Sequence, residues 1–231
     1  MDGKDQNNAA ILAWSGGKDS ALALYELTRL GSTEVVALLT TVTEGYDRVS
    51  MHGVRRELLA EQARASGYPL DEVSIPQQCT NEMYEQRMGL ALEKYRQSGI
   101  TQAAFGDLFL EDVRAYREER LSRIGMHGIF PLWGRDTSEL ARQFVGLCFR
   151  AVVVCVDTQA LDGAFAGREY DGDFLKDLPG EVDPCGENGE FHTFVYAGPV
   201  FRGPIQVERG EKVLRENRFQ YCDLLAGQLS G

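Results

Sequence analysis

Six consecutive residues near the N-terminus have the chemical character needed to bind a phosphate group. They are Ser15, Gly16, Gly17, Lys18, Asp19 and Ser20. The glycines let backbone N–H groups approach an anion closely, the lysine adds a positive charge, and the serines supply hydroxyl donors. The segment lacks the GxGxxG pattern of dinucleotide-binding loops, and a Walker A loop would have Ser or Thr directly after the lysine, where this chain has Asp19. The sequence therefore predicts a phosphate-binding loop of another type.

A second group of reactive side chains lies in the segment DPCGENGEFHTF at residues 183–194. Glu187 and Glu190 could accept protons or bind a cation, and we favour this interpretation over a tight turn that only leads into a strand. Cys185 with His192 as a base would instead suit acyl transfer, an alternative that we weight less. Asp107, which follows a predicted strand, is a third candidate carboxylate.

The elements that must position these residues alternate between strand and helix. Apolar runs predict strands at residues 9–14, 35–40, 72–75, 102–105 and 151–156, and helical spacing predicts helices at residues 19–30, 54–66, 81–98, 111–124 and 137–149. Such alternation is typical of an α/β fold, in which helices cover a parallel sheet. Ligands of these folds bind at the carboxyl ends of the strands, where the phosphate loop falls.

The composition of the chain changes after Asp157, where glycines divide it into short pieces. We expect strands at residues 191–196 and 212–221 there. The predicted domains are an α/β domain at residues 1–157 and a smaller mixed C-terminal lobe at residues 158–231.

The overall charge and the cysteine pattern exclude several classes of protein. With 24 Lys and Arg against 35 Asp and Glu, the net charge is −11, which opposes binding to a nucleic acid. The five cysteines are scattered without a CxxC pair, so neither a disulfide framework nor a structural zinc site is expected, and no residue is assigned as a metal ligand. No run approaches the roughly 18 apolar residues of a membrane span, and the polar N-terminus is unlike a signal peptide, so we expect a cytoplasmic protein without membrane contact.

One helix, residues 111–124, carries four arginines, at positions 114, 117, 120 and 123. Glutamates interleave with them, so we favour a solvated helix face with salt bridges over a basic patch for RNA.

The phosphate loop and several later motifs resemble a known family. SGGKDS directly after an apolar strand resembles the PP-loop of the ATP pyrophosphatase superfamily. MHG at residues 51–53, GDLFLEDVRAYREERLSRIGM at 106–126, PLWGRD at 131–136 and DPCGENGEFHTF at 183–194 complete a combination that is similar to the diphthine-ammonia ligase family. The resemblance extends from about residue 9 to residue 220.

This resemblance implies a Rossmann-like, adenine nucleotide alpha hydrolase-like sheet of about five parallel strands. The adenine would lie near the end of the second strand, at Leu39, Thr40 and Thr41. It also implies that ATP, with Mg²⁺, adenylates a carboxylate and that ammonia then displaces AMP to give an amide.

The site residues that we expect fall into two further sets. The expected catalytic residues are Lys18, Asp107, Glu187 and Glu190, and the expected substrate-binding residues are His52, Trp133, Glu187 and His192. The expected partners are a carboxylate substrate and ammonia, and a homodimer is a candidate assembly. Two alternatives stay open, an ATP-dependent transferase that acts on a nucleobase and a nucleotide sensor without ligase chemistry.

Overall fold

The computed structural model describes residues 8–45, 48–49 and 53–227 of the 231-residue chain. Its strands are β1 (Ala9–Ala13), β2 (Glu34–Thr43), β3 (Arg48–Val49), β4 (Leu70–Ile75), β5 (Gln102–Ala104), β6 (His127–Ile129), β7 (Arg150–Asp157), β8 (Phe191–Ala197), β9 (Val207–Arg215) and β10 (Phe219–Ala226). Its α-helices are α1 (Lys18–Leu30), α2 (Arg56–Ser66), α3 (Asn81–Gln97), α4 (Glu111–Ser122), α5 (Thr137–Gly146) and α6 (Gly172–Asp177).

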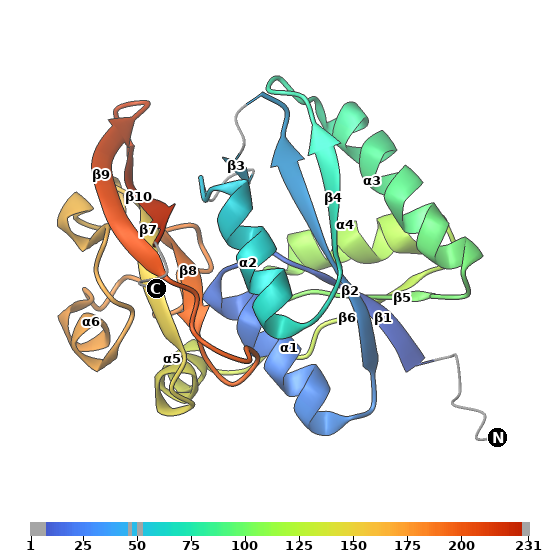
Figure 1. The fold of residues 1–231 in the computed structure, drawn as a ribbon, viewed down its shortest axis with the longest axis horizontal. Coiled ribbons are helices and arrows are strands. Elements are labelled where there is room, and N and C mark those ends of the chain that lie inside the picture. Colours follow the sequence, from blue (N-terminus) through green and yellow to red (C-terminus); the bar gives the residue numbers. More distant parts are fainter. Residues whose placement is uncertain (1–7, 46–47, 50–52, 228–231) are drawn as a thin grey trace.

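The first sheet is the predicted parallel sheet. β1 pairs with β2 and β5, β2 pairs with β4, and β5 pairs with β6, all in parallel, and the short β3 joins the end of β2 in the antiparallel sense. Successive residues of a strand point to opposite faces, so Leu12 of β1 packs in one hydrophobic cluster and Ile11 in the other. α1 and α2 cover the first face, whereas α3 and α4 cover the second (Figure 1).

The second sheet is antiparallel, in the order β8-β7-β10-β9, and it lies against α1 and α2 on the side away from the parallel sheet (Figure 1). β7 was expected as a buried strand, and it is one, but its partners are β8 and β10 and not the strands of the parallel sheet. The predicted domain boundary after residue 157 remains a prediction. Strand pairing places β7, which ends at Asp157, in the same antiparallel sheet as the C-terminal strands β8 and β10.

Three local features differ from the sequence-based predictions. The expected strand at residues 212–221 is a hairpin, because Glu216 and Asn217 adopt φ values of 51° and reverse the chain between β9 and β10. The two short strands β3 and β6 were not predicted. α5 ends at Gly146 and not at the predicted residue 149, and it is capped at its start by Asp136, whose Oδ1 accepts a hydrogen bond from the backbone N of Glu139 at 2.8 Å.

Among the described residues, no helix is both long and apolar enough to cross a membrane.

Candidate active site

A cavity of about 350 Å³ lies at the carboxyl ends of β1, β2 and β5, beside the amino end of α1. Its walls combine the phosphate loop, the end of β2, the turn after β5 and the loop that precedes β8. The lining residues with predicted roles are Ser15, Gly17, Lys18, Asp19, Ser20, Leu39, Thr40, Thr41, Asp107, Glu187 and His192. The fold thus brings residues from both ends of the chain to the edge of the sheet where α/β proteins bind ligands.

The phosphate loop needs its first glycine for two reasons. Gly16 has a φ of +77°, and a Cβ at this position would lie 2.7 Å from Oε1 of Gln62. The serines brace the loop, since Ser20 Oγ donates to the carbonyl of Gly17 at 2.9 Å and Gly17 N donates to Ser15 Oγ at 3.2 Å. α1 starts directly at Lys18, so the positive end of its dipole faces the cavity.

The loop is also joined to the second sheet. The backbone N of Lys18 donates to Thr193 Oγ1 at 3.0 Å, and the backbone N of Val195 donates to the carbonyl of Gly16 at 2.9 Å. The conformation of the phosphate loop therefore depends on β8, which lies far away in the sequence.

Gln62 of α2 is a residue that the sequence analysis missed. Its side chain is fully buried, accepts from Trp14 Nε1 at 2.9 Å, and donates to the carbonyls of Gly16 at 2.9 Å and Val195 at 2.6 Å. It thus holds β1, the loop and β8 together. Its signal in the sequence is a polar residue on the apolar face that Leu58 begins, at the i, i+4 spacing of a helix.

Lys18 is buried beside the negative charge of Asp19. Its Nζ lies 2.9 Å from Asp19 Oδ2 and 5.5 Å from the ring centre of Phe191. Burial by itself lowers the pKa of Lys18, but the attraction of Asp19, together with Cys185 and Glu187, raises it above its usual value. Lys18 is therefore protonated at neutral pH and supplies a fixed positive charge in the cavity.

Glu187 is the carboxyl group of this cavity that can exchange a proton near neutrality. Its Oε1 accepts from the backbone N of Leu108 at 2.7 Å, and its own N donates to Asp183 Oδ2 at 2.9 Å. Burial raises the pKa of Glu187 to about 7, against the opposing effect of the Leu108 N–H. A group with such a pKa can act as an acid and as a base under physiological conditions.

Asp107 lines the cavity, but its charge is compensated by Arg117 of α4. Arg117 Nε lies 2.6 Å from Asp107 Oδ2, and Arg117 Nη2 donates to Asp107 Oδ1 at 3.1 Å. The guanidinium also lies 4.4 Å from the ring centre of Phe105. The predicted solvated face of α4 is present at Arg114 and Arg123, which pair with glutamates of the same helix, whereas Arg117 lines the cavity.

Besides Gly16 of the phosphate loop, two predicted residues lie outside the lining of the cavity. Glu190 is turned into its own loop, where Oε1 accepts from the backbone N of Asp183 at 3.1 Å and from Asn188 Nδ2 at 3.0 Å. Trp133 packs against Phe130 and lies 4.7 Å from the guanidinium of Arg114. Their roles in catalysis and substrate binding stay predictions, as does that of His52, which lies outside the described residues.

The geometry does not support Cys185 as a nucleophile. Its Sγ donates to the carbonyl of Thr137 at 3.3 Å, and burial raises the pKa of the thiol to about 12. Burial and the nearby Lys18 lower the pKa of His192 to about 4, so His192 is neutral at physiological pH. A thiolate paired with a protonated histidine is therefore disfavoured.

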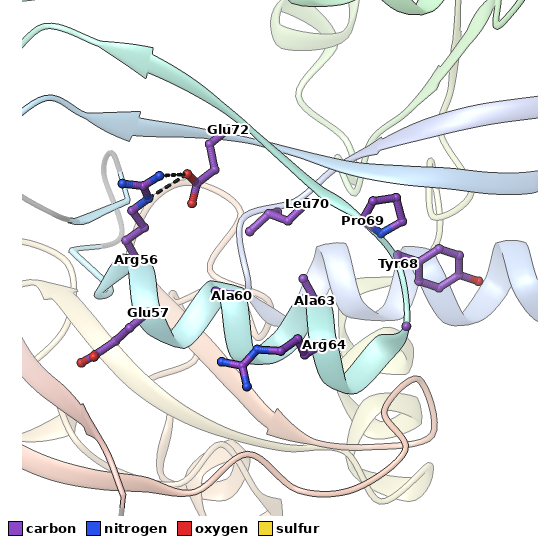
Figure 2. A pocket seen from close by; sticks show the side chains of 10 residues that line it. Arg56, Glu57, Ala60, Ala63, Arg64, Tyr68, Pro69, Leu70 and Glu72 are labelled. Carbon is purple, nitrogen blue, oxygen red and sulfur yellow. Dashed lines mark hydrogen bonds and ion pairs between the residues drawn. The ribbon is translucent and has the colours of Figure 1, made fainter.

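A broader hollow of about 790 Å³ lies between α2 and β4 (Figure 2). Its lining includes Ala60, Ala63 and Leu70, and Arg56 Nε donates to Glu72 Oε2 at 2.7 Å at one end of it. It shares no lining residue with the cavity at the phosphate loop. None of the predicted site residues that the structure describes lines this hollow, and those that line a cavity lie in the one at the phosphate loop.

Comparison with known families agrees with this arrangement. The diphthamide synthase N-terminal domain matches residues 8–128, and the diphthamide synthase C-terminal domain matches residues 136–226. The chain belongs to the diphthamide synthase family. The phosphate loop falls in the first matched region and Glu187 in the second, so the cavity is built from both family domains.

Individual relatives are named diphthine–ammonia ligase. Diphthine–ammonia ligase of Homo sapiens is 25% identical over 226 residues, which cover 87% of this chain and 83% of the human protein. The Bos taurus enzyme of that name is 24% identical over 225 residues. The Schizosaccharomyces pombe protein is 25% identical over 229 residues, but these cover 38% of its length. The family resemblance that the motifs indicated is confirmed.

Proposed function

We propose that this protein is an ATP-dependent ligase that activates a carboxylate as an acyl-adenylate and amidates it with ammonia, releasing pyrophosphate and AMP. The observation that carries the proposal is the presence of Glu187, with a pKa of about 7, in the same cavity as the phosphate loop. The names of the relatives, diphthine–ammonia ligase, support the same class of reaction.

The nucleotide half of the cavity suits ATP. Lys18 and the amino end of α1 would bind the phosphates, and Leu39, Thr40 and Thr41 at the end of β2 would contact the adenine. The described residues contain no group of three or more His, Cys, Asp or Glu that could hold a metal ion. The site therefore fits Mg²⁺ only in the way that this ion usually binds with nucleotides, through phosphate oxygens and one or two carboxylates, of which Asp19 is the candidate. When bound, Mg²⁺ would neutralise phosphate charge.

The first step needs little from the protein beyond orientation and charge. An oxygen of the substrate carboxylate attacks the α-phosphorus of ATP, the bond from this phosphorus to the bridging oxygen breaks, and pyrophosphate leaves. The positive charge of Lys18 stabilises the negative charge that develops on the phosphates. The activated acyl group can then lose AMP, a much better leaving group than oxide.

Glu187 has the chemistry that the second step requires. Ammonia is mostly ammonium at neutral pH, so a base must accept a proton before nitrogen can attack the acyl carbon. Ionised Glu187 would bind ammonium and take this proton. Nitrogen would then attack the acyl carbon, the bond between this carbon and the AMP oxygen would break, and water or the departing AMP would accept the second proton that the nitrogen loses. The fixed hydrogen bond from Leu108 N, 2.7 Å long, orients the carboxyl group for this role.

Product analysis with ATP labelled at the α-phosphate tests the proposal. The protein is incubated with Mg²⁺, ¹⁵N-labelled ammonium and small-molecule or protein fractions of the source cell. We expect labelled AMP that depends on both ammonium and a fraction, and a product that gains ¹⁵N. Lys18→Ala should lose this activity, and Lys176→Ala, which changes an exposed lysine, should keep it. ADP as the product, or bound ATP that no fraction causes to be cleaved, would refute the proposal, and the latter would favour the sensor.

A further inference from the structure

A second cavity, of about 210 Å³, lies between α3 and α4 on the outer face of the parallel sheet. Most of its wall is aromatic or aliphatic, and the side chains that form this part are Tyr84, Met88, Leu92, Phe105, Tyr116 and Leu121. The lining also includes charged side chains, and two of them form an ion pair in which Arg120 Nη2 lies 2.6 Å from Glu85 Oε1. A cavity with this lining suits an apolar group better than a phosphate or a nucleobase edge.

This α3–α4 cavity adjoins the candidate active site. Tyr84, Met88, Phe105 and Arg117 line both cavities. At the junction, Arg117 pairs with Asp107, and the next residue of the chain, Leu108, donates its N–H to Glu187. The two cavities thus share a wall that includes Arg117, on the side of the active site where Asp107, Leu108 and Glu187 lie. The expected adenine contacts at Leu39–Thr41 do not line the α3–α4 cavity.

Gly89 is a position from which a side chain could fill the α3–α4 cavity. It lies inside α3 and lines the cavity, and a Cβ at this position would meet no heavy atom within 4 Å. Its backbone is helical, so no left-handed conformation requires glycine there. A Cβ there therefore fits without a clash, and a larger side chain at the same position is expected to extend into the cavity.

We propose that the α3–α4 cavity binds the apolar body of the acyl substrate, a carboxylic acid with an aromatic ring or a compact aliphatic group. This inference rests on the proposed function. A cavity of about 150 Å³ accommodates benzene, so 210 Å³ suits one substituted ring. With the ring in place, the carboxylate passes Arg117 and enters the active site. The guanidinium, whose five N–H donors are not all used by the two contacts to Asp107, favours a carboxylate at the junction.

The test uses phenylacetate as a probe and measures binding without turnover. A methyl group of Leu92, which lines the α3–α4 cavity and not the active-site cavity, is labelled with ¹³C and identified by Leu92→Ile. It reports on the α3–α4 cavity by NMR, with AMP present to occupy the nucleotide site. We expect saturable shifts of this methyl with a dissociation constant on the order of 1 mM. Gly89→Phe, which places a ring in the cavity, should weaken phenylacetate binding at least about tenfold. Gly89→Ala is the matched control and should bind phenylacetate as the wild type does.

AMP affinity and thermal melting are measured for the same variants. Equal AMP affinity in all of them is expected, since the cavity lies outside the nucleotide half of the site. Three results would overturn the proposal: no shift of the Leu92 methyl at about 20 mM phenylacetate, undiminished binding in Gly89→Phe, or loss of AMP binding in that variant, which would assign the cavity to the nucleotide. Gly89→Leu replaces Gly89→Phe if the latter does not fold. Because the assay needs no catalysis, its failure would leave AMP formation untouched, and failure of the ligase reaction would leave the binding result intact.

Discussion

Replacing Glu187 with glutamine should make the protein more stable at pH 8 while it removes amidation. The glutamine side chain would keep an oxygen that can accept from the Leu108 N–H, but it would carry no charge. In the wild type, burial raises the pKa of Glu187 to about 7 from a usual value of 4.5. The folded protein therefore holds a proton that the unfolded chain has lost between these pH values. The destabilisation is absent below about pH 4.5, grows as the pH rises, and is complete above about pH 7.

The size of this effect follows from the shift of the pKa. A change from 4.5 to about 7 is about 2.5 units, and at about 1.36 kcal/mol per unit this gives an upper bound of about 3.4 kcal/mol. Glu187 is half-buried at the wall of a cavity open to water, so solvent screening reduces the expected gain to about 1.5–2 kcal/mol. For a chain of this length, the melting temperature of Glu187→Gln at pH 8 should exceed that of the wild type by about 3–8 °C.

Melting curves at pH 5, 6, 7 and 8, followed by circular dichroism, measure this difference. Glu181→Gln is the matched control, because it makes the same chemical change at an exposed position of the same loop, and it should melt with the wild type at every pH. An NMR titration of the carboxyl carbon of Glu187 checks the pKa directly. The reasoning would be refuted if Glu187→Gln melted at or below the wild-type temperature at pH 8, or if its gain were as large at pH 5.

Three further predictions concern the same site. Fraction-dependent AMP formation should rise with pH through about 7 as Glu187 ionises, and Glu187→Gln should lose this step in the profile; an unchanged profile would assign the base elsewhere. Gln62→Leu removes the three hydrogen bonds that the Gln62 side chain makes to buried polar groups. Urea titration should therefore show a loss of about 2–5 kcal/mol in the free energy of unfolding, and ATP should bind more weakly. A loss below about 0.5 kcal/mol would contradict the bridging role of Gln62. Cys185→Ala should keep AMP formation within about threefold of the wild type, because the thiol is protonated. A loss of AMP formation of about 100-fold or more would instead indicate that Cys185 acts as a nucleophile.

Local sequence signals predicted most of the first domain. The apolar run that ends at Trp14, two glycines and a helical pattern led to a strand, a phosphate loop and a helix, and the structure confirms the strand and the helix. These signals work because side-chain periodicity and glycine conformation depend on near neighbours. Prediction was weaker in the C-terminal part, where short strands alternate with turns. The hairpin at Glu216 and Asn217 was missed because neither residue is the glycine that usually marks such a turn.

By itself, the sequence determined that the chain has an α/β fold with a glycine-containing loop, predicted to bind phosphate, at the carboxyl edge of its sheet, and its motifs identified the family. Only the tertiary structure decided which of the candidate residues share a cavity. Glu187 and Glu190 are three positions apart in the sequence, yet one lines the cavity and the other closes its own loop. Arg117 is one of four similar arginines on a helix, and the position of Asp107 after β5 singles it out. The pKa of Glu187, which gives the site its proposed chemistry, depends on burial by segments far away in the chain, and no local window of sequence contains that information.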